Sequence, residues 1–378
     1  MLSMYSLGND LYTGKRSLPV IKKTKLWLSI AALAIIVSIA ALFVRGLNLG
    51  IEFTGGSQFT ISKTAVLDQQ PAVDVIARYT GDSAARVAEV GSDTMRIQSS
   101  TQKLSNSEVE TIRQDLARAY KVDVTDVTST FIGPSWGQDI SKKALQGFIV
   151  FVVLAMVGLS LYFRSWRNAA GAMLALFHDL IVSIGVYCLL GFEVTPSTVI
   201  GLLTILGYSL YDTVVVFDKV RENTTQLLSQ RDYTFAESVN LAVNQTLIRS
   251  MNTSITSLMP VASILFIGVL VLNAGTLSDL SLVMFVGLIL STLSSIFIAS
   301  PLSVVLANSD PRIREHTKQV QELRNKRLQE REQLRERGEI SDEDDDADLL
   351  APAMGSIRQP GHRLDNSAQP KRKNRRKK

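Results

Sequence analysis

The feature that most constrains this chain is a set of long stretches that contain no charged residue. Residues 26–44, 144–163, 250–278 and 280–309 contain no Asp, Glu, Lys or Arg. A helix needs about 20 mostly apolar residues to cross the hydrocarbon core of a bilayer, and these stretches reach that length. Because a soluble domain rarely contains even one such stretch, the sequence predicts a polytopic α-helical membrane protein.

Two further apolar segments carry internal charges but have apolar flanks on both sides, so we interpret them as spans as well. The alternative for the first span, a cleaved signal peptide, is disfavoured because its apolar core exceeds the usual length of about 7–15 residues. The six predicted spans are 26–45, 143–163, 168–190, 196–218, 250–272 and 279–306.

The distribution of basic residues predicts the orientation of the spans. Lys and Arg occur in residues 1–25, in the turn after the second span, in the loop after the fourth and in the tail, residues 307–378. The turns at 191–195 and 273–278 contain neither residue type. Under the positive-inside rule, both termini are therefore cytoplasmic, and residues 46–142 lie on the opposite side of the membrane.

Residues 46–142 predict one small α+β domain outside the membrane. The expected elements are a strand at 58–62, a helix at 71–79, strands at 86–90 and 94–98, a helix at 107–120 capped by Ser105 and Glu108, and a strand at 124–132. The order β-α-β-β-α-β is typical of a ferredoxin-like fold. That fold hosts many activities, and we find no nucleophile–base pair or phosphate loop here. The domain is therefore interpreted as a binding or lever domain.

Composition narrows the function classes further. The formal net charge is +5, but seven positive charges lie in Lys371–Lys378, and without them the balance would be −2. A folded nucleic-acid binder would carry its basic residues along one face, so this class is disfavoured. The single cysteine, Cys188, excludes an internal disulfide and a cysteine-based metal site. The three histidines are far apart in the sequence, so they do not suggest a pair of metal ligands. We expect neither a metal nor a cofactor.

Asp212 is the strongest functional candidate in the predicted spans. It precedes Asp218 by six residues and Lys219 by seven, which places it about 10 Å inside the cytoplasmic end of the fourth span. An ionisable side chain at membrane depth costs about 3 kcal/mol or more, so a functional role is the default interpretation. A carboxyl whose ionisation is opposed by burial and favoured by a nearby cation can take up and release a proton. A buried ion pair that only holds helices together is the structural alternative.

Arg249 begins the fifth span on the same predicted side as Asp212. The two side chains could pair across adjacent helices, and an anchor at the lipid headgroups is the alternative role for Arg249. The strictly apolar run that follows, residues 258–272, is too short to cross a bilayer, so the span must include polar side chains that face protein or water. These polar residues are Asn252, Thr253, Ser254, Thr256 and Ser257.

Other polar positions leave two interpretations open. His178 and Asp179, inside the third span, indicate either a second proton relay or a hydrogen-bonded polar plug that orients the helices. Tyr208 and Asp218 on the fourth span are supporting candidates, and Asp218, at a helix end, is interpreted mainly as solvated. The glycines predicted to allow close helix packing are Gly201, Gly207 and Gly268.

Four segments resemble signatures of SecF, the bacterial protein-export membrane subunit. Residues 207–223 (GYSLYDTVVVFDKVREN) resemble the fourth-span signature, and residues 176–179 (LFHD) resemble the third-span motif. Residues 245–256 resemble the entry to the fifth span, and residues 50–56 (GIEFTGG) resemble the motif after the first span. The four motifs occur in the family order and cover about residues 20–307. The motif residues after the first span are Gly50, Glu52, Thr54, Gly55 and Gly56.

The resemblance implies a subunit that pairs with SecD and associates with the SecYEG channel in the bacterial inner membrane. It implies that proton flow, without ATP use by SecDF itself, drives motion of the exported domains, which pull the preprotein outward. The family's proton pathway then corresponds to Asp212 and Arg249 here, which agrees with the ranking from burial cost. SecA and accessory Sec subunits are further candidate partners, together with the lipid bilayer.

Three residues depart from the family pattern and leave the neighbours of the relay open. Glu52 stands where Asp is usual, Tyr211 where many relatives have Asn, and Ser257 where Thr is common. The alternative function is half of a proton-coupled, RND-like transporter for small molecules. Such a pump usually carries much larger exported domains with an apolar ligand cavity. An intramembrane enzyme is disfavoured, because no motif places a serine beside His178 and Asp179.

The tail lies outside the resemblance. Residues 310–337 are charged and contain helical i,i+4 pairs such as Glu322 and Lys326. After about residue 338 the composition cannot bury a core, so we expect disorder. The basic end, Lys371–Lys378, could contact anionic lipid or ribosomal RNA, and a solvated tail is the alternative.

Overall fold

The computed structural model describes residues 4–14, 16–81, 85–90, 93–99, 104–163, 166–269 and 277–337 of the 378-residue chain. Most of the predicted turn between the fifth and sixth spans, and the tail from residue 338 with its basic end, lie outside these residues. The chain divides into two compact units. One contains Val20–Asp218 and Thr246–Ala307, and the other contains the described parts of residues 1–19, 219–245 and 308–378.

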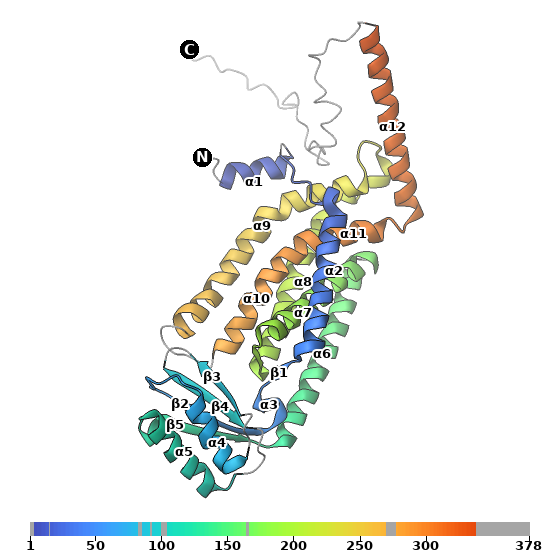
Figure 1. The fold of residues 1–378 in the computed structure, drawn as a ribbon. Helices are drawn as coiled ribbons and strands as arrows, with labels where there is room; N and C mark the ends of the chain where they lie inside the picture. The colour runs from blue at the N-terminus through green and yellow to red at the C-terminus, as the bar shows by residue number, and fades with distance from the viewer. Residues whose placement is uncertain are drawn as a thin grey trace, which may run out of the picture. The chain divides into compact units, whose positions relative to one another are not determined.

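Six of the described helices are long and apolar enough to cross a membrane, which confirms the predicted fold class (Figure 1). Their extents with adjoining turns are Ile21–Arg45, Ser135–Phe163, Arg167–Leu190, Pro196–Ser229, Phe235–Ile267 and Ser278–Ala307. The helices themselves are α1 (Met4–Thr13), α2 (Thr24–Arg45), α3 (Ile51–Thr54), α4 (Gln70–Thr80), α5 (Asn106–Tyr120), α6 (Pro134–Phe163), α7 (Trp166–Leu190), α8 (Pro196–Thr224), α9 (Phe235–Ser263), α10 (Ser278–Ser294), α11 (Ser300–Ala307) and α12 (Pro311–Glu336).

Two π-helical segments continue the fifth and sixth spans, Ile264–Val269 (η4) after α9 and Ser295–Ala299 (η6) between α10 and α11. Such wide turns are rare and often lie at functional sites. The helix of the fifth span begins at Phe235, well before the predicted start of that span at residue 250. Thr234 and Glu237 form a capping box there: the Thr234 backbone N–H donates to Glu237 Oε2 at 2.8 Å, and the Glu237 backbone N–H donates to Thr234 Oγ1 at 3.3 Å.

Close helix packing centres on α7, which contacts α2, α6, α10 and α11. A Cβ atom at Gly185 of α7 would lie 2.1 Å from Ser38 Oγ of α2, so only glycine permits this approach. Gly201 has the predicted role, because a Cβ there would lie 2.2 Å from Val283 Cγ1 of α10. The prediction for Gly207 is not met within the described residues, because none of their atoms lies within 4 Å of its Cβ position. The surroundings of Gly268 lie outside those that the structure describes.

The small domain contains a four-stranded antiparallel sheet, as predicted. Its strands are β2 (Gly56–Ile61), β3 (Arg86–Val90), β4 (Thr94–Ser99) and β5 (Val127–Ile132), in the spatial order β3-β4-β2-β5. This order places the first and third strands of the β-α-β-β-α-β unit at the centre, which is the arrangement of a ferredoxin-like fold. We call this part the sheet domain. A separate parallel pair joins β1 (Asn48–Leu49) to β6 (Glu193–Val194).

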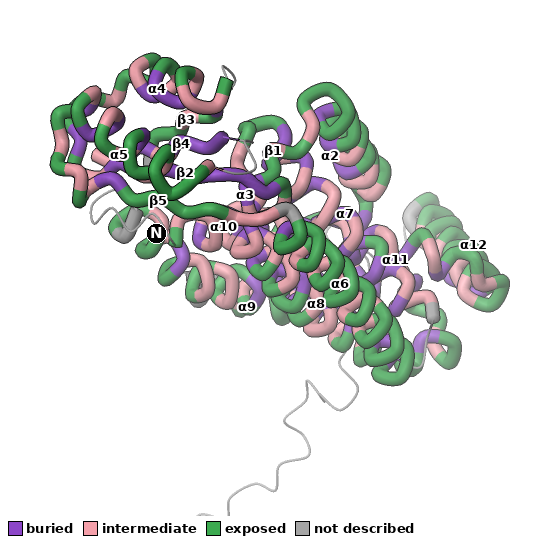
Figure 2. The backbone as a smooth tube through the Cα atoms, turned by 90° about the horizontal axis from the view of Figure 1, so that it is seen from below, coloured by how far each residue is buried: buried purple, intermediate pink, exposed green. Residues whose placement is uncertain are grey.

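One hydrophobic core holds the sheet domain together. Alternate residues of β2 and β4, such as Phe59 and Ile97, point toward α4 and α5, whose Ile76 and Leu116 are fully buried. The predicted capping box of α5 is present, with Ser105 and Glu108 satisfying each other's backbone N–H groups. Strand β5 begins at Val127, later than predicted, because Val124–Asp126 form a 3₁₀ turn capped by Asp123. Figure 2 shows buried residues on β2 and β4, whereas α6 is largely exposed.

The second unit connects α12 to the segment that begins α9. Arg324 of α12 donates to both carboxylate oxygens of Glu237, at 2.8 and 3.1 Å, and to the backbone oxygen of Asp232 at 3.0 Å. His316 Nε2 lies 2.6 Å from the backbone oxygen of Gln230. A bidentate arginine–carboxylate contact is directional, so α12 has a defined place against this segment. The helix occupies the charged stretch in which helical spacing was expected.

Candidate functional site

Asp212 of α8 is a buried carboxylate held by two hydroxyl groups. The residue is 9% exposed. Ser250 Oγ of α9 donates to Oδ1 at 2.7 Å, and Ser295 Oγ of η6 donates to Oδ2 through a short hydrogen bond. The π-helical turn directs Ser295 at the carboxylate. Because a hydroxyl both donates and accepts, this arrangement can hold either the ionised or the protonated acid.

The predicted ion pair between Asp212 and Arg249 is not formed in this structure. Arg249 is exposed, and the contact to Asp212 is made by the next residue, Ser250. Consecutive residues on an α-helix point about 100° apart. Since Ser250 faces Asp212, Arg249 leaves α9 about 100° to the side of it. The guanidinium of α9 and the carboxylate of α8 therefore do not meet in this structure.

Asp179 of α7 forms a second buried acidic site. It is 1% exposed and accepts a hydrogen bond from Ser209 Oγ of α8 at 2.7 Å. His178 Nδ1 lies 3.1 Å from the other carboxylate oxygen of Asp179. Among the described residues, the second ring nitrogen of His178 is buried and has no hydrogen-bond partner. The hydrogen bond between Asp179 and Ser209 joins α7 to α8. Such a link fits both sequence-based interpretations, the proton relay and the polar plug.

The two acidic sites meet α8 at positions one helical turn apart. Ser209 and Asp212 are three residues apart, and residues at this spacing are neighbours on a helix surface. A line of polar groups therefore runs from His178 and Asp179 on α7, across α8, to Ser250 on α9. Ionisable groups at membrane depth are costly, so a functional role is the default interpretation of this line. Its carboxyl, imidazole and hydroxyl groups are of the types that pass protons.

A small cavity of about 20 Å³ adjoins Asp212. This volume is enough for one water molecule, which needs about 10–15 Å³ and polar partners. Thr292 Oγ1 donates to Ser254 Oγ at 2.7 Å beside it. Two of the predicted lining residues, Tyr208 and Thr253, lie at this cavity. The full lining is Tyr208, Tyr211, Asp212, Thr253, Ser254, Ser257, Leu288, Ser291 and Thr292.

Three other sequence candidates lie away from the cavity. Asn252 and Thr256 of α9 are exposed, and Thr256 Oγ1 donates to backbone oxygens of its own helix. Asp218 is exposed at the end of the fourth span, where the Tyr162 hydroxyl donates to it at 3.2 Å. All three side chains are exposed in the single chain, so a role of Asn252 and Thr256 in the relay stays a prediction, and the exposure of Asp218 agrees with its interpretation as mainly solvated.

The motif after the first span, residues 50–56, forms the connection into the sheet domain, which we call the joint. Gly55 and Gly56 have φ angles of 74° and 139°, which favour glycine. Thr54 Oγ1 donates to the backbone oxygen of Gly50 at 3.2 Å. A Cβ at Gly50 would lie 2.5 Å from Oε2 of Glu52. These five residues therefore shape the junction between helix α2 and strand β2, and they are not part of the Asp212 site.

Glu52 in this joint is partly withdrawn from water. Its Oε2 atom is buried and has no hydrogen-bond partner among the described residues. Burial raises the pKa of Glu52, and the nearby Glu193 carboxylate raises it further. A hydrogen bond from the backbone N–H of Glu52 lowers this pKa in part. The ionised form therefore costs more in the folded chain than in the unfolded chain. The raised pKa therefore adds to the free energy of unfolding at low pH. This contribution is complete below the ordinary pKa of 4.5, and it is lost as the pH rises through the raised pKa of the folded chain.

We expect Glu52→Gln to raise the midpoint temperature of thermal unfolding by a few degrees at neutral pH. The difference from wild type should shrink as the pH falls toward 4.5, because wild-type Glu52 is then also neutral. Thermal unfolding of the purified protein at a series of pH values measures this. Asp139→Asn, at an exposed acid, is the matched control and should show no such trend. A constant difference at every pH would contradict the prediction.

Sequence reasoning missed the hydroxyl groups that hold the two acids. Ser209 and Ser250 lie inside the sequence motifs, but the motifs do not predict their contacts with the acids, and Ser295 lies outside the motifs. A signal was present, because the sixth span contains several serines that are buried in the structure. Buried hydroxyls at membrane depth need partners. These serines are Ser281, Ser291, Ser294, Ser295, Ser300 and Ser303.

Comparison with known proteins shows the family of this chain. The family model for the C-terminal part of the protein export membrane proteins SecD/SecF matches residues 112–309, and the model of the SecD/SecF GG motif matches residues 40–62. The protein translocase subunit SecF of Streptomyces coelicolor is 41% identical, over 99% of this chain and 100% of that protein. SecF of Mycobacterium tuberculosis is 39% identical, over 86% of this chain and 75% of that protein.

A solved structure shows the same fold. The crystal structure of SecDF from Thermus thermophilus superimposes with a TM-score of 0.67 at 29% identity. It covers 78% of this chain, and this chain covers 39% of it. The protein translocase subunit SecDF of Thermus thermophilus is 33% identical over 74% of this chain and 37% of that protein. This chain therefore spans about two fifths of the SecDF chains that it matches.

The six candidate membrane helices, together with the matches to protein export membrane proteins and translocase subunits, place this chain among membrane transport proteins. The chain belongs to the SecF family of protein translocase subunits. The resemblance stated from the four sequence motifs is thus confirmed.

Proposed function

We propose that this subunit uses the proton-motive force to assist late, ATP-independent stages of preprotein translocation through the SecYEG channel. The observation that carries this proposal is the buried polar line from Asp179 to Asp212 and Ser250. Two carboxyl groups at membrane depth can exchange protons with the two sides of a membrane, whereas a purely structural role rarely justifies their cost. In this proposal Arg249 joins the proton pathway when helix α9 rotates about its axis, or when a helix of a partner subunit moves Arg249 toward Asp212.

The partner that completes the membrane part is SecD. Tyr208, Tyr211 and Arg249 are exposed in the single chain, as are Asn252 and Thr256 of the same helical region. Polar side chains at membrane depth must face protein or water, so this face is unsuited to lipid. We infer that SecD helices cover it. The Thermus thermophilus SecDF, which matches this chain over part of its length, is named as one translocase subunit.

The remaining parts of the proposal concern location. The positive-inside pattern supports a bacterial cytoplasmic membrane protein with both termini inside and the sheet domain outside, where it meets the exported preprotein. SecYEG, SecA and accessory Sec subunits are the further partners we propose. The alternative, half of an RND-like exporter of small molecules, receives less support. The interior of the sheet domain is filled by the buried side chains of its core.

Gradient-dependent release of a preprotein tests the proposed function. Translocation of a preprotein is started with ATP in membrane vesicles that contain this subunit, SecD and SecYEG, and ATP is then removed. We expect the vesicles to release the preprotein faster when a proton gradient is imposed. A protonophore should abolish the increase, because the gradient is the energy source. Vesicles without the subunit are the control. Equal release with and without the gradient would disprove the proposal.

A further inference from the structure

The acidic sites and the covalent links to the sheet domain lie on different helices. The sheet domain follows α2 and precedes α6, whose apolar stretches, residues 26–44 and 144–163, contain no ionisable acid. Asp179 and Asp212 lie on α7 and α8. A movement that begins at these acids can reach the sheet domain indirectly, through the packing of α7 on α2 and α6. The turn between α7 and α8 offers a direct path, because it contacts a strand of the sheet.

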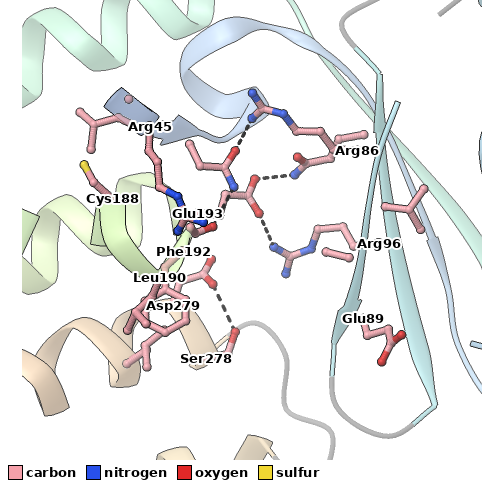
Figure 3. Close-up of a pocket in the computed structure, with 18 residues that line it drawn as sticks. Arg45, Arg86, Glu89, Arg96, Cys188, Leu190, Phe192, Glu193, Ser278 and Asp279 are labelled. Carbon is pink, nitrogen blue, oxygen red and sulfur yellow. Dashed lines mark hydrogen bonds and ion pairs between the residues drawn. The ribbon is translucent and has the colours of Figure 1, made fainter. Parts of the chain in front are cut away.

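That turn faces a cavity of about 830 Å³ between the helices and the sheet domain. Figure 3 shows Glu193, from the turn, extending between the helix ends and the strands, with Arg96 and Arg86 opposite. The cavity is bounded by the ends of α2, α7 and α10 on one side and by β3 and β4 on the other. Glu193 crosses this space and contacts the sheet.

Both carboxylate oxygens of Glu193 contact β4, an inner strand of the sheet. Arg96 Nη1 lies 3.0 Å from Oε2, and Gln98 Nε2 donates to Oε1 at 2.5 Å. The side chains of Arg96 and Glu193 are 17% and 15% exposed, so water screens this ion pair less than a surface pair. Since β4 pairs with both β3 and β2, a force on Arg96 is distributed over the whole sheet.

The backbone of the same turn is fastened on both sides. Glu193 and Val194 form the parallel pair with Asn48 and Leu49, and the Gly50 N–H donates to the Val194 oxygen at 3.0 Å. This pair attaches the turn to the segment that leads into the sheet domain. The turn is thus joined to the sheet domain at its entry and at an inner strand.

The turn is also fastened to the first turn of α8. Thr198 Oγ1 donates to the backbone oxygen of Glu193 at 3.4 Å, and Thr195 and Thr198 exchange backbone-to-side-chain hydrogen bonds at 3.2 and 3.3 Å. From Pro196 the helix is continuous to Asp212, a distance of about 24 Å at 1.5 Å per residue. A continuous helix moves as a stiff rod, so a tilt or shift at Asp212 displaces Glu193.

We propose that Glu193 is the coupling residue that transmits movement of α8 to the sheet domain through Arg96 and Gln98. This inference rests on the proposed function, because it explains how proton binding at Asp212 becomes movement of the domain that meets the preprotein. Glu193 is a positioning residue in this scheme: it binds neither the proton nor the preprotein. The expected signature of its loss is uncoupling, in which protons flow but no longer drive release.

The experiment measures proton flux and gradient-stimulated release in the same vesicles, with SecD and SecYEG present. We expect Glu193→Ala to lower the gradient-stimulated release about tenfold, the range in which single contacts change coupling between sites. Proton flux should stay close to the wild-type value. Glu89→Gln is the matched control, because Glu89 lines the same cavity from β3 and is exposed. It should leave both quantities unchanged.

A reciprocal exchange keeps the proposal testable if Glu193→Ala fails to assemble. Arg96→Glu and Glu193→Arg should each lower release alone, and the double variant should recover part of it, because the opposite charges again face each other. Absence of recovery, unchanged release in Glu193→Ala, or loss of flux together with release would each overturn the proposal. If the wild type itself shows no gradient-stimulated release, the proposed function fails and this inference with it. If only the proposed role of Glu193 is wrong, the wild type still shows gradient-stimulated release.

Discussion

Replacing Asp212 with asparagine is expected to abolish gradient-stimulated preprotein release and proton flux while leaving the subunit folded. The asparagine side chain cannot bind and release a proton in this range, so the relay is interrupted at its centre. It can still satisfy both neighbours, because its oxygen accepts and its NH₂ group donates, and the hydroxyls of Ser250 and Ser295 can take either role. The predicted loss is therefore one of function and not of structure.

Three measurements separate this expectation from simple misfolding. Assembly with SecD, proton flux and gradient-stimulated release are measured on the same vesicle preparation. Asp218→Asn is the matched control, since it makes the same substitution on the same helix at an exposed position, and it should retain both flux and release. If Asp212→Asn releases preprotein as well as wild type, the buried charge is structural. The proton path must then be sought at His178 and Asp179 or in SecD.

Replacing Gly185 with valine should cause the largest loss of stability in the membrane bundle. A Cβ atom there would lie 2.1 Å from Ser38 Oγ and 2.6 Å from Ser38 Cα. The second of these is a backbone atom, so no change of rotamer can relieve the overlap, and α2 and α7 must separate. Overpacking of this kind typically costs about 1–3 kcal/mol, occasionally more, and we expect a value at or above the top of that range.

The amount of folded protein in the membrane and its thermal unfolding in detergent measure this effect. Gly147→Val is the control, because Gly147 of α6 is another glycine of a spanning helix, and no atom in the described part of the chain lies within 4 Å of its Cβ position. It should accumulate and unfold like the wild type. Equal stability of the two variants would show that α2 and α7 do not approach each other as closely as described.

The sequence by itself determined the membrane architecture and the chemistry at its centre. Charge-free stretches predict spans because the bilayer demands about 20 apolar residues, a requirement that no tertiary contact can alter. The order of strands and helices in the sheet domain followed from local periodicity and from the Ser105 capping box. Asp212 and Asp179 stood out because an acid at membrane depth is costly wherever its helix points.

Only the tertiary structure decided which groups meet. Asp212 contacts Ser295 across 83 residues of sequence, and Arg96 contacts Glu193 across 97. Such contacts depend on how each helix is rotated about its axis, and one residue of rotation exchanges Arg249 for Ser250 beside Asp212. Rotation is set by the packing of neighbouring helices and not by local sequence. For the same reason the sequence predicted close packing at Gly207, where no described residue comes within 4 Å of the Cβ position, and missed it at Gly185.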